Sequence, residues 1–245
     1  MSLVSTDWLE KNIKKIKLID CSWHLPNSKR DSYREYIDGH IPNAIFFDLD
    51  KNSDQNSDLP HMLPDKNSWE KIISSMGISN EDNIIIYDNS DLISSCRCWY
   101  TFIYFGHNPK LVSILDGGLK KWKIENRSIS NNTVKISKSS YAAKENKELV
   151  KDKKQIDENI LNNKFKVIDA RSKARFEGKE KEPREGIRSG SIPNSYCLPF
   201  KELINKNNTF KEKNEISKKF KNILKSRISS NVVFSCGSGV TAAVL

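Results

Sequence analysis

The chain has few of the features that mark membrane, secreted or metal-binding proteins. None of its apolar stretches approaches the roughly 20 residues that a membrane-spanning helix needs, and its N-terminal segment has neither the charged start nor the apolar run of a secretory signal. The five cysteines are an odd number, and they form neither a Cys-x-x-Cys pair nor a Cys/His pattern typical of zinc sites. We therefore expect a protein of the reducing cytoplasm, with no membrane partner, no metal and no cofactor.

The sequence also lacks the concentrated basic stripe, interleaved with aromatic residues, that is typical of nucleic-acid-binding proteins. Its formal net charge is +10. The lysines, however, alternate with Asn, Ser, Glu and Asp along the chain, as in residues 211–215. A lysine-rich surface is the simpler interpretation, and we expect no nucleic-acid partner.

What the sequence does contain is a repeat. Three short motifs occur twice, in the same order, at offsets of 149, 151 and 148 residues. Such ordered matches at nearly one offset indicate a duplicated domain. We predict a first domain over residues 1–124, a connector over 125–150 and a second domain over 151–245. The matching pairs are Lys17–Asp20 with Lys166–Asp169, Gly39–Asn43 with Gly190–Asn194, and Asn83–Asp88 with Asn231–Cys236.

Short apolar runs alternate with segments of helical spacing. Leu18–Asp20, Asn83–Tyr87 and Leu111–Leu115 are predicted as buried strands, and Ser68–Met76 and Trp99–Phe105 as helices. Strands separated by helices favour a parallel sheet covered on both faces, so the expected fold class is α/β. In an open parallel sheet, ligands bind beyond the carboxyl ends of the strands.

The last predicted strand runs directly into Cys236. Gly237 and Gly239 allow the positive φ angles with which consecutive amide groups turn toward a sulfur atom. Those amide dipoles, with a helix N-terminus behind them, stabilise a thiolate, which is the form that attacks. The segment therefore indicates covalent cysteine chemistry, with a buried structural cysteine as the alternative. The first copy has Asp88 at the corresponding place, so it has no nucleophile there.

The whole chain, from Leu3 to Leu245, resembles the tandem-rhodanese sulfurtransferases. The resemblance implies two rhodanese-like domains, each a central, mostly parallel sheet flanked by helices. The loop Cys-Gly-Ser-Gly-Val-Thr is similar to that of 3-mercaptopyruvate sulfurtransferases, whereas thiosulfate sulfurtransferases usually have Arg and Lys in its second and third places. The matching segments are Asp38–Ala44, Phe46–Asp50, Leu115–Trp122, Glu182–Gly186 and Cys236–Thr241.

This resemblance implies a reaction and the residues that carry it. Sulfur would move from 3-mercaptopyruvate to a persulfide on Cys236, with release of pyruvate; thiosulfate is the alternative donor. Arg184 matches the arginine that holds the substrate carboxylate, and Arg188 is expected to assist. The alternative for either arginine is a surface ion pair. Further loop contacts to the substrate are expected from Gly237, Gly239, Val240 and Thr241.

The resemblance also assigns a proton relay. Asp50 and His61 match an aspartate and a histidine that are proposed in this family to work with the loop serine, here Ser238. The expected acceptors of the sulfur are a thiol, such as a thioredoxin or a small thiol, and cyanide in the test tube. The five tryptophans are expected to fill the cores, with an approach to the cleft between the two domains as the alternative for Trp23, and no function is assigned to them.

Two other classes of function compete with this interpretation. A phosphatase of the Cys-x5-Arg type shares the loop architecture, but Ala242 stands where its phosphate-binding arginine is needed. A non-catalytic or truncated sulfur-relay or binding module is the second. The sequence stops at Leu245, where relatives continue through a helix and another strand, so we expect the second domain to be incomplete at its C-terminus.

Overall fold

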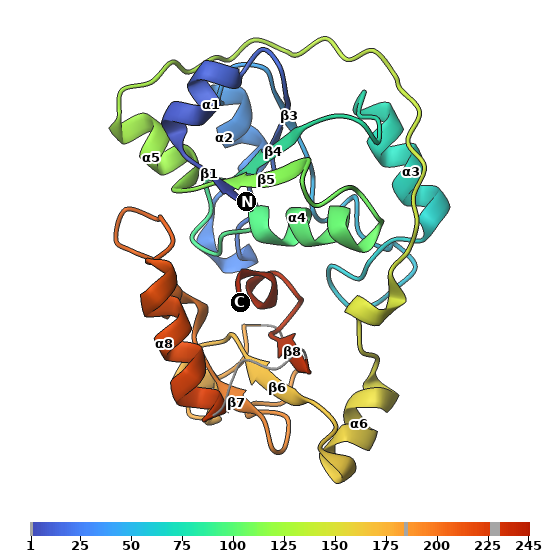
Figure 1. Ribbon diagram of the computed structural model, residues 1–245, viewed down its shortest axis with the longest axis vertical. Coiled ribbons are helices and arrows are strands. Elements are labelled where there is room, and N and C mark those ends of the chain that lie inside the picture. The colour runs from blue at the N-terminus through green and yellow to red at the C-terminus, as the bar shows by residue number, and fades with distance from the viewer. Residues whose placement is uncertain (1, 184–185, 226–230) are drawn as a thin grey trace. The chain divides into compact units, whose positions relative to one another are not determined.

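The protein is described by a computed structural model over residues 2–183, 186–225 and 231–245 (Figure 1). It divides into two compact units. The first comprises the residues up to Lys147 together with Asn207–Thr209, and the second comprises Glu148–Lys206 and Phe210–Leu245. Each unit has its own parallel β-sheet. In the described parts of the chain, no helix is both long and apolar enough to cross a membrane.

The first unit is built on a five-stranded sheet in the order β1-β5-β4-β2-β3, in which all neighbouring strands are parallel. Every residue of β4 and β5 is buried, because both faces of the sheet are covered. The three predicted strands are confirmed to within one residue. The strands are β1 (Leu3–Val4), β2 (Lys17–Asp20), β3 (Ala44–Phe46), β4 (Ile84–Tyr87) and β5 (Val112–Leu115).

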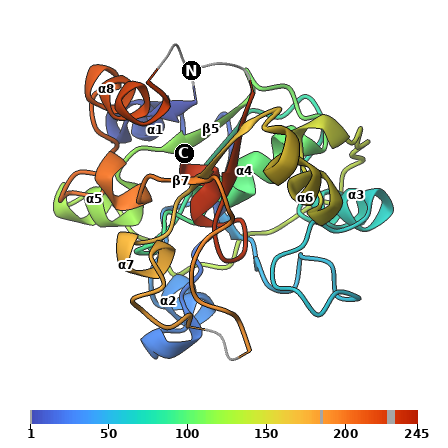
Figure 2. The ribbon, with the colours of Figure 1, turned by 90° about the horizontal axis from the view of Figure 1, so that it is seen from below.

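Helices cover both faces of this sheet, with α1, α2 and α5 on one side and α3 and α4 on the other (Figures 1 and 2). The first side packs Leu9, Tyr36 and Trp122 onto the sheet. On the second side, Trp69 stacks on Phe105, with ring centroids 4.9 Å apart. These helices are α1 (Thr6–Asn12), α2 (Ser32–Asp38), α3 (Lys66–Ser75), α4 (Ser95–Tyr104) and α5 (Gly118–Ile124), with a 3-10 helix η1 (Pro26–Ser28) before α2.

The helix predicted over Trp99–Phe105 begins earlier, at Ser95. The carboxylate of Asp88 accepts a hydrogen bond from the backbone N–H of Ser95, at 3.0 Å, and so satisfies a donor at the start of α4. Because this first turn is polar, the spacing of apolar residues does not predict it.

Residues 125–147, predicted as part of a connector, belong to the first unit. Ser130 pairs with His40 in an isolated antiparallel bridge. The backbone N–H of Ser139 donates to the carbonyl of Ser74 at 3.1 Å, and Asn80 Nδ2 donates to the carbonyl of Ala142 at 2.8 Å. These hydrogen bonds fasten a segment that has few large apolar side chains.

The second unit contains a three-stranded parallel sheet in the order β7-β6-β8. Its core joins Ile168 of β6 to Phe220 and Leu224 of α8. The strands are β6 (Lys166–Asp169), β7 (Tyr196–Cys197) and β8 (Val232–Ser235). The helices are α6 (Lys153–Asn162), α7 (Lys173–Phe176) and α8 (Lys213–Leu224), with the 3-10 helices η2 (Lys147–Leu149), η3 (Phe200–Leu203) and η4 (Thr241–Val244).

The two sheets repeat the same strand pairing. In the first unit β2 pairs with β4 from Lys17↔Ile84 to Asp20↔Tyr87, and in the second β6 pairs with β8 from Lys166↔Val232 to Asp169↔Ser235. The next residue is Asp88 in one unit and Cys236 in the other. The two units thus share one pattern of strand pairing, which is the pattern that a duplicated domain predicts.

Candidate active site

Cys236 lies at the carboxyl end of β8 and is partly buried. The backbone N–H of Gly239 donates to its Sγ at 3.1 Å. Gly239 has a φ of +79°, a left-handed conformation in which glycine has no steric cost, and this conformation turns its N–H inward. Val240 is buried and anchors the loop, whereas Gly237 is exposed.

Two features of this loop differ from the sequence-based expectation. A positive φ occurs at Gly239 but not at Gly237. The loop is followed by the four-residue 3-10 helix η4 rather than by an α-helix. A helix dipole is a sum over aligned peptide units, so four residues supply little of it. The hydrogen bond from the Gly239 N–H is one interaction of the loop that can stabilise negative charge on the sulfur.

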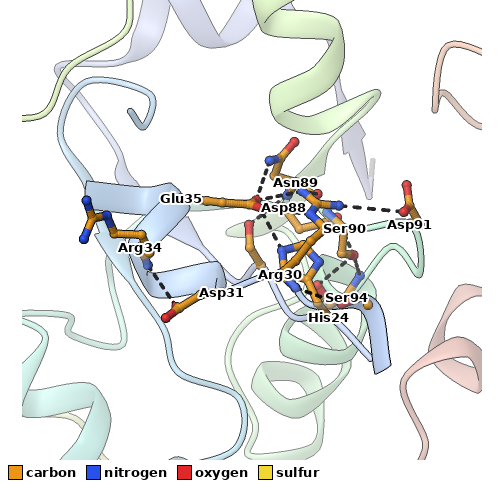
Figure 3. A network of polar contacts seen from close by, with 12 residues as sticks. His24, Arg30, Asp31, Arg34, Glu35, Asp88, Asn89, Ser90, Asp91 and Ser94 are labelled. Atoms are coloured by element: carbon orange, nitrogen blue, oxygen red, sulfur yellow. Dashed lines mark hydrogen bonds and ion pairs between the residues drawn. The ribbon is translucent and has the colours of Figure 1, made fainter. Parts of the chain in front are cut away.

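The corresponding loop of the first unit holds a carboxylate instead of a sulfur (Figure 3). Asp88 Oδ1 accepts hydrogen bonds from the backbone N–H and the Oγ of Ser90, both at 2.8 Å, and Asp88 Oδ2 accepts one from the N–H of Ser95. The side chain is buried. This loop therefore already contains its anion, and it has no nucleophile at that place.

A cluster of polar side chains pins the Asp88 loop from outside (Figure 3). Glu35 accepts hydrogen bonds from Arg30 Nε at 2.7 Å and from Asn89 Nδ2 at 2.8 Å, and Arg30 Nη2 donates to the carbonyl of Asn89 at 3.0 Å. Burial alone would raise the pKa of Glu35, but the hydrogen bonds from Arg30 and Asn89 outweigh it and lower that pKa. The charged carboxylate thus serves to fix the loop.

Asp50 and His61 are brought together as predicted. His61 Nε2 donates to Asp50 Oδ1 at 2.8 Å. A residue that the sequence left without a function joins them: Trp23 Nε1 donates to Asp50 Oδ2 at 2.9 Å. Only the position of Trp23, three residues beyond the end of β2, points to a site at the carboxyl edge of the sheet. Ser238, the third member of the predicted relay, belongs to the second unit.

Arg184 and Arg188, the predicted partners of the substrate carboxylate, lie between Glu182 and Gly190 in the sequence. Glu182 and Gly190 both bind Arg171, which follows β6. Arg184 lies outside the described residues, and Arg188 is exposed. Arg171 holds the two sides of this segment, because its Nη1 donates to Glu182 Oε1 and its Nη2 to the carbonyl of Gly190, both at 2.7 Å.

The same guanidinium is paired with a carboxylate of β6. Arg171 Nη2 donates to Asp169 Oδ2 at 2.6 Å. Glu182 is bound a second time by Arg175. One side chain thus fastens Glu182 and Gly190 to the sheet of the second unit, a role that the sequence did not predict.

Of the other cysteines, three are fully buried in the first unit: Cys21, Cys96 and Cys98. Burial raises the pKa of the Cys21 and Cys96 thiols well above the ordinary value. Burial and the charge of Asp169 raise the pKa of Cys197 to about 11. The thiols of Cys21, Cys96 and Cys197 are therefore poor nucleophiles. No group of three or more His, Cys, Asp or Glu side chains that could hold a metal ion occurs among the described residues.

Comparison with known proteins places this geometry in a family. Residues 5–125 match the family description of the rhodanese-like domain. The chain is 39% identical to the 3-mercaptopyruvate sulfurtransferase of Mus musculus over 98% of its length and 83% of the relative. It is 31% identical to the thiosulfate sulfurtransferase of Bos taurus over 98% of its length and 83% of that protein. The crystal structure of the Escherichia coli 3-mercaptopyruvate sulfotransferase SseA superposes with a TM-score of 0.87 at 32% identity, covering 100% of this chain and 91% of that one.

Proposed function

Because this chain belongs to the rhodanese family of sulfurtransferases, we propose that it transfers sulfur from 3-mercaptopyruvate through a persulfide on Cys236 to an acceptor thiol, with release of pyruvate. The observation that carries the proposal is the hydrogen bond from the Gly239 N–H to Cys236 Sγ, at the carboxyl end of a parallel strand. A donor at that place stabilises the thiolate that attacks and the charge that develops around sulfur.

In the proposed reaction the Cys236 thiolate attacks the thiol sulfur of 3-mercaptopyruvate. A sulfur–sulfur bond forms, the carbon–sulfur bond breaks, and its electron pair passes into the neighbouring carbonyl to give the enolate of pyruvate. The cysteine sulfur is oxidised to the persulfide level and the substrate carbon is reduced. The methyl carbon of pyruvate gains one proton, which balances the one that the donor thiol gives up.

We assign that proton transfer to Asp50, His61 and Ser238. A histidine exchanges protons near neutral pH, and a carboxylate on one ring nitrogen fixes which nitrogen carries the proton. The 2.8 Å contact between Asp50 and His61 supports the first half of this relay. Arg184, with Arg188, is the proposed partner of the substrate carboxylate.

The loop composition favours 3-mercaptopyruvate over thiosulfate. Gly237 and Ser238 carry no charge, whereas a doubly charged donor is better matched by a cationic loop. Thiosulfate is the second candidate donor, because the bovine relative is named for it. The ratio of kcat/KM on the two donors distinguishes them; a higher value on thiosulfate would overturn the assignment.

We propose an external acceptor in a reducing compartment such as the cytoplasm, since all five cysteines are free thiols and burial raises the pKa of three of them. Residues 148–245, which include Cys236, contain 21 Lys and Arg against 12 Asp and Glu, whereas residues 1–147 contain 20 against 19. This excess favours acceptor proteins with an acidic surface.

The experiment is mass spectrometry of the protein after incubation with 3-mercaptopyruvate, together with an assay for pyruvate. We expect one added sulfur on the peptide that contains Cys236 and stoichiometric pyruvate. Cys236→Ser removes both signals, whereas the control Cys197→Ser retains both. Pyruvate release by Cys236→Ser, or an added sulfur on another cysteine, would contradict the proposal.

A further inference from the structure

The indole of Trp23 and the imidazole of His61 hold the two oxygens of one carboxylate. Trp23 Nε1 donates to Asp50 Oδ2 at 2.9 Å, and His61 Nε2 donates to Asp50 Oδ1 at 2.8 Å. The two rings also touch each other, edge to face, with centroids 4.6 Å apart and planes at 87°. Each member of this trio therefore contacts both of the others.

Burial divides the trio into a rigid and an exposed part. The side chain of His61 is 2% exposed and Trp23 is 6% exposed, whereas the Asp50 side chain is 66% exposed. A donor from a buried ring restricts the rotamers of an exposed carboxylate, so Trp23 helps to fix the place of the Asp50 carboxylate.

His61 is fixed through its backbone as well. Its φ of +56° is unusual for a residue with a side chain. Arg97, which is buried in α4, donates from Nη2 to the carbonyl of His61 at 2.6 Å. The backbone of His61 is therefore held by Arg97 of α4, while the imidazole Nε2–H is directed at Asp50.

We infer that Trp23 is a positioning residue for the proton transfer: its N–H orients Asp50, and Asp50 in turn keeps the proton of the neutral imidazole on Nε2. This leaves Nδ1 of His61 as the nitrogen that accepts a proton. The inference rests on the proposed function, because it assigns Trp23 to the relay of that reaction.

Trp23→Phe tests the inference, because phenylalanine keeps an aromatic ring against His61 but has no N–H. We expect kcat with 3-mercaptopyruvate to fall by about 10- to 100-fold with KM within about twofold of wild type, since orientation and not binding is lost. Trp23→His returns a ring N–H and recovers part of the loss. The matched control is Trp122→Phe, which removes another buried indole donor of the first unit, one that binds the carbonyl of Ser128 at 2.8 Å.

A double-mutant cycle separates positioning from a general structural effect. If Trp23 acts through Asp50, Trp23→Phe has no further effect on kcat in an Asp50→Asn background, and the two single variants share one pH–rate profile. The inference would be overturned if the losses in kcat of Trp23→Phe and Asp50→Asn were additive. It would also be overturned if Trp23→Phe and Trp122→Phe had the same kcat, or if Trp23→His were no faster than Trp23→Phe. Persulfide formation on Cys236 of the wild type is measured in parallel. If the wild type forms no persulfide, the proposed function fails, and this result is distinct from a failure of the role of Trp23.

Discussion

Asp88 and Cys236 occupy the same place in two copies of one parallel ladder. Asp88 follows β4, Cys236 follows β8, and these strands pair in the same register with β2 and β6. In the first unit, hydrogen bonds from Ser90 and Ser95 hold a permanent carboxylate. In the second, the N–H of Gly239 faces a sulfur. The same edge of the fold thus holds a hydrogen-bonded carboxylate in the first unit and Cys236, the proposed nucleophile, in the second.

Replacing the Asp88 carboxylate should destabilise the protein. In Asp88→Asn the amide NH2 faces either the Ser95 N–H or the two Ser90 donors, so at least one buried donor loses its acceptor. We expect the free energy of unfolding to fall by about 1–3 kcal/mol in urea denaturation. Asp91→Asn is the control, because its carboxylate is 66% exposed and pairs with Lys120 at the surface; a change of about 0–1 kcal/mol is expected there. Equal effects of the two substitutions would contradict this account.

The backbone of the same loop leaves no room for a side chain at Gly118. This residue has a φ of +53°, and a Cβ atom added to it would collide with the carbonyl oxygen of Asp88. Gly118→Ala should lower the midpoint of thermal unfolding more than Gly178→Ala, which also has a positive φ but meets no atom closer than 3.6 Å. The conformational cost of about 1–3 kcal/mol is common to both, so the difference reports the collision. A smaller effect at Gly118 would be inconsistent with the packing described.

The buried Asp20 should make stability depend on pH. The pKa of Asp20 is raised to about 6. Burial is the largest cause of this shift, and hydrogen bonds from Ser22 act against it. The folded state therefore binds this proton more tightly than the unfolded state, and the contribution of Asp20 to stability falls as pH rises through about 6. For a pKa raised from 3.8 to about 6, the free energy of unfolding falls by about 3 kcal/mol, at about 1.4 kcal/mol per pKa unit.

The measurement is urea denaturation of wild type and Asp20→Asn at pH 4.5 and 7.5. The variant should gain stability relative to wild type by roughly 2–3 kcal/mol on going to the higher pH. Asp58→Asn, at an exposed carboxyl, shows what removal of a surface charge does by itself. A relative loss at pH 7.5 would mean that the Asp20 carboxylate is stabilised, not penalised, by its surroundings.

Glu182 should control the binding of the sulfur donor. Burial raises the pKa of Glu182, but Arg175 and Arg171 outweigh it and lower that pKa, so the carboxylate stays charged between two guanidinium groups. Glu182→Gln weakens the contacts of residue 182 with Arg171 and Arg175 and should raise KM for 3-mercaptopyruvate by about 3- to 30-fold, more than it lowers kcat. Glu177→Gln, whose partners Lys173 and Lys179 are at the surface, is the control. An unchanged KM in Glu182→Gln would show that these contacts do not serve the substrate.

Sulfur transfer to an acidic protein should depend on salt. Residues 148–245 hold nearly all of the excess positive charge, so we expect the second-order rate constant for transfer to a thioredoxin of net negative charge to fall as NaCl rises from 25 to 300 mM. Transfer to the neutral thiol 2-mercaptoethanol provides the comparison and should change little. Parallel salt profiles for the two acceptors would exclude electrostatic guidance.

The sequence alone established the class of fold, and it predicted the duplication and the candidate nucleophile. These features depend on local patterns: buried parallel strands are short apolar runs, and Cys236 with Gly239 is a continuous motif. The start of α4 at Ser95 was not predictable in this way, because its first turn is stabilised by Asp88 from outside the helix. The sequence predicted the start of a helix behind the loop, and Thr241–Val244 form a 3-10 helix there.

The contacts that hold the candidate residues in place are seen only in the tertiary structure. Trp23 reaches Asp50 across 27 positions of the chain, and Arg171 reaches both Glu182 and Gly190. Neither contact has a sequence signature, because a tryptophan that fills a core and one that donates to a carboxylate look alike in a sequence. Which of the two it does depends on where separate loops meet at the carboxyl edge of the sheet, and that follows from the order of the strands and their register.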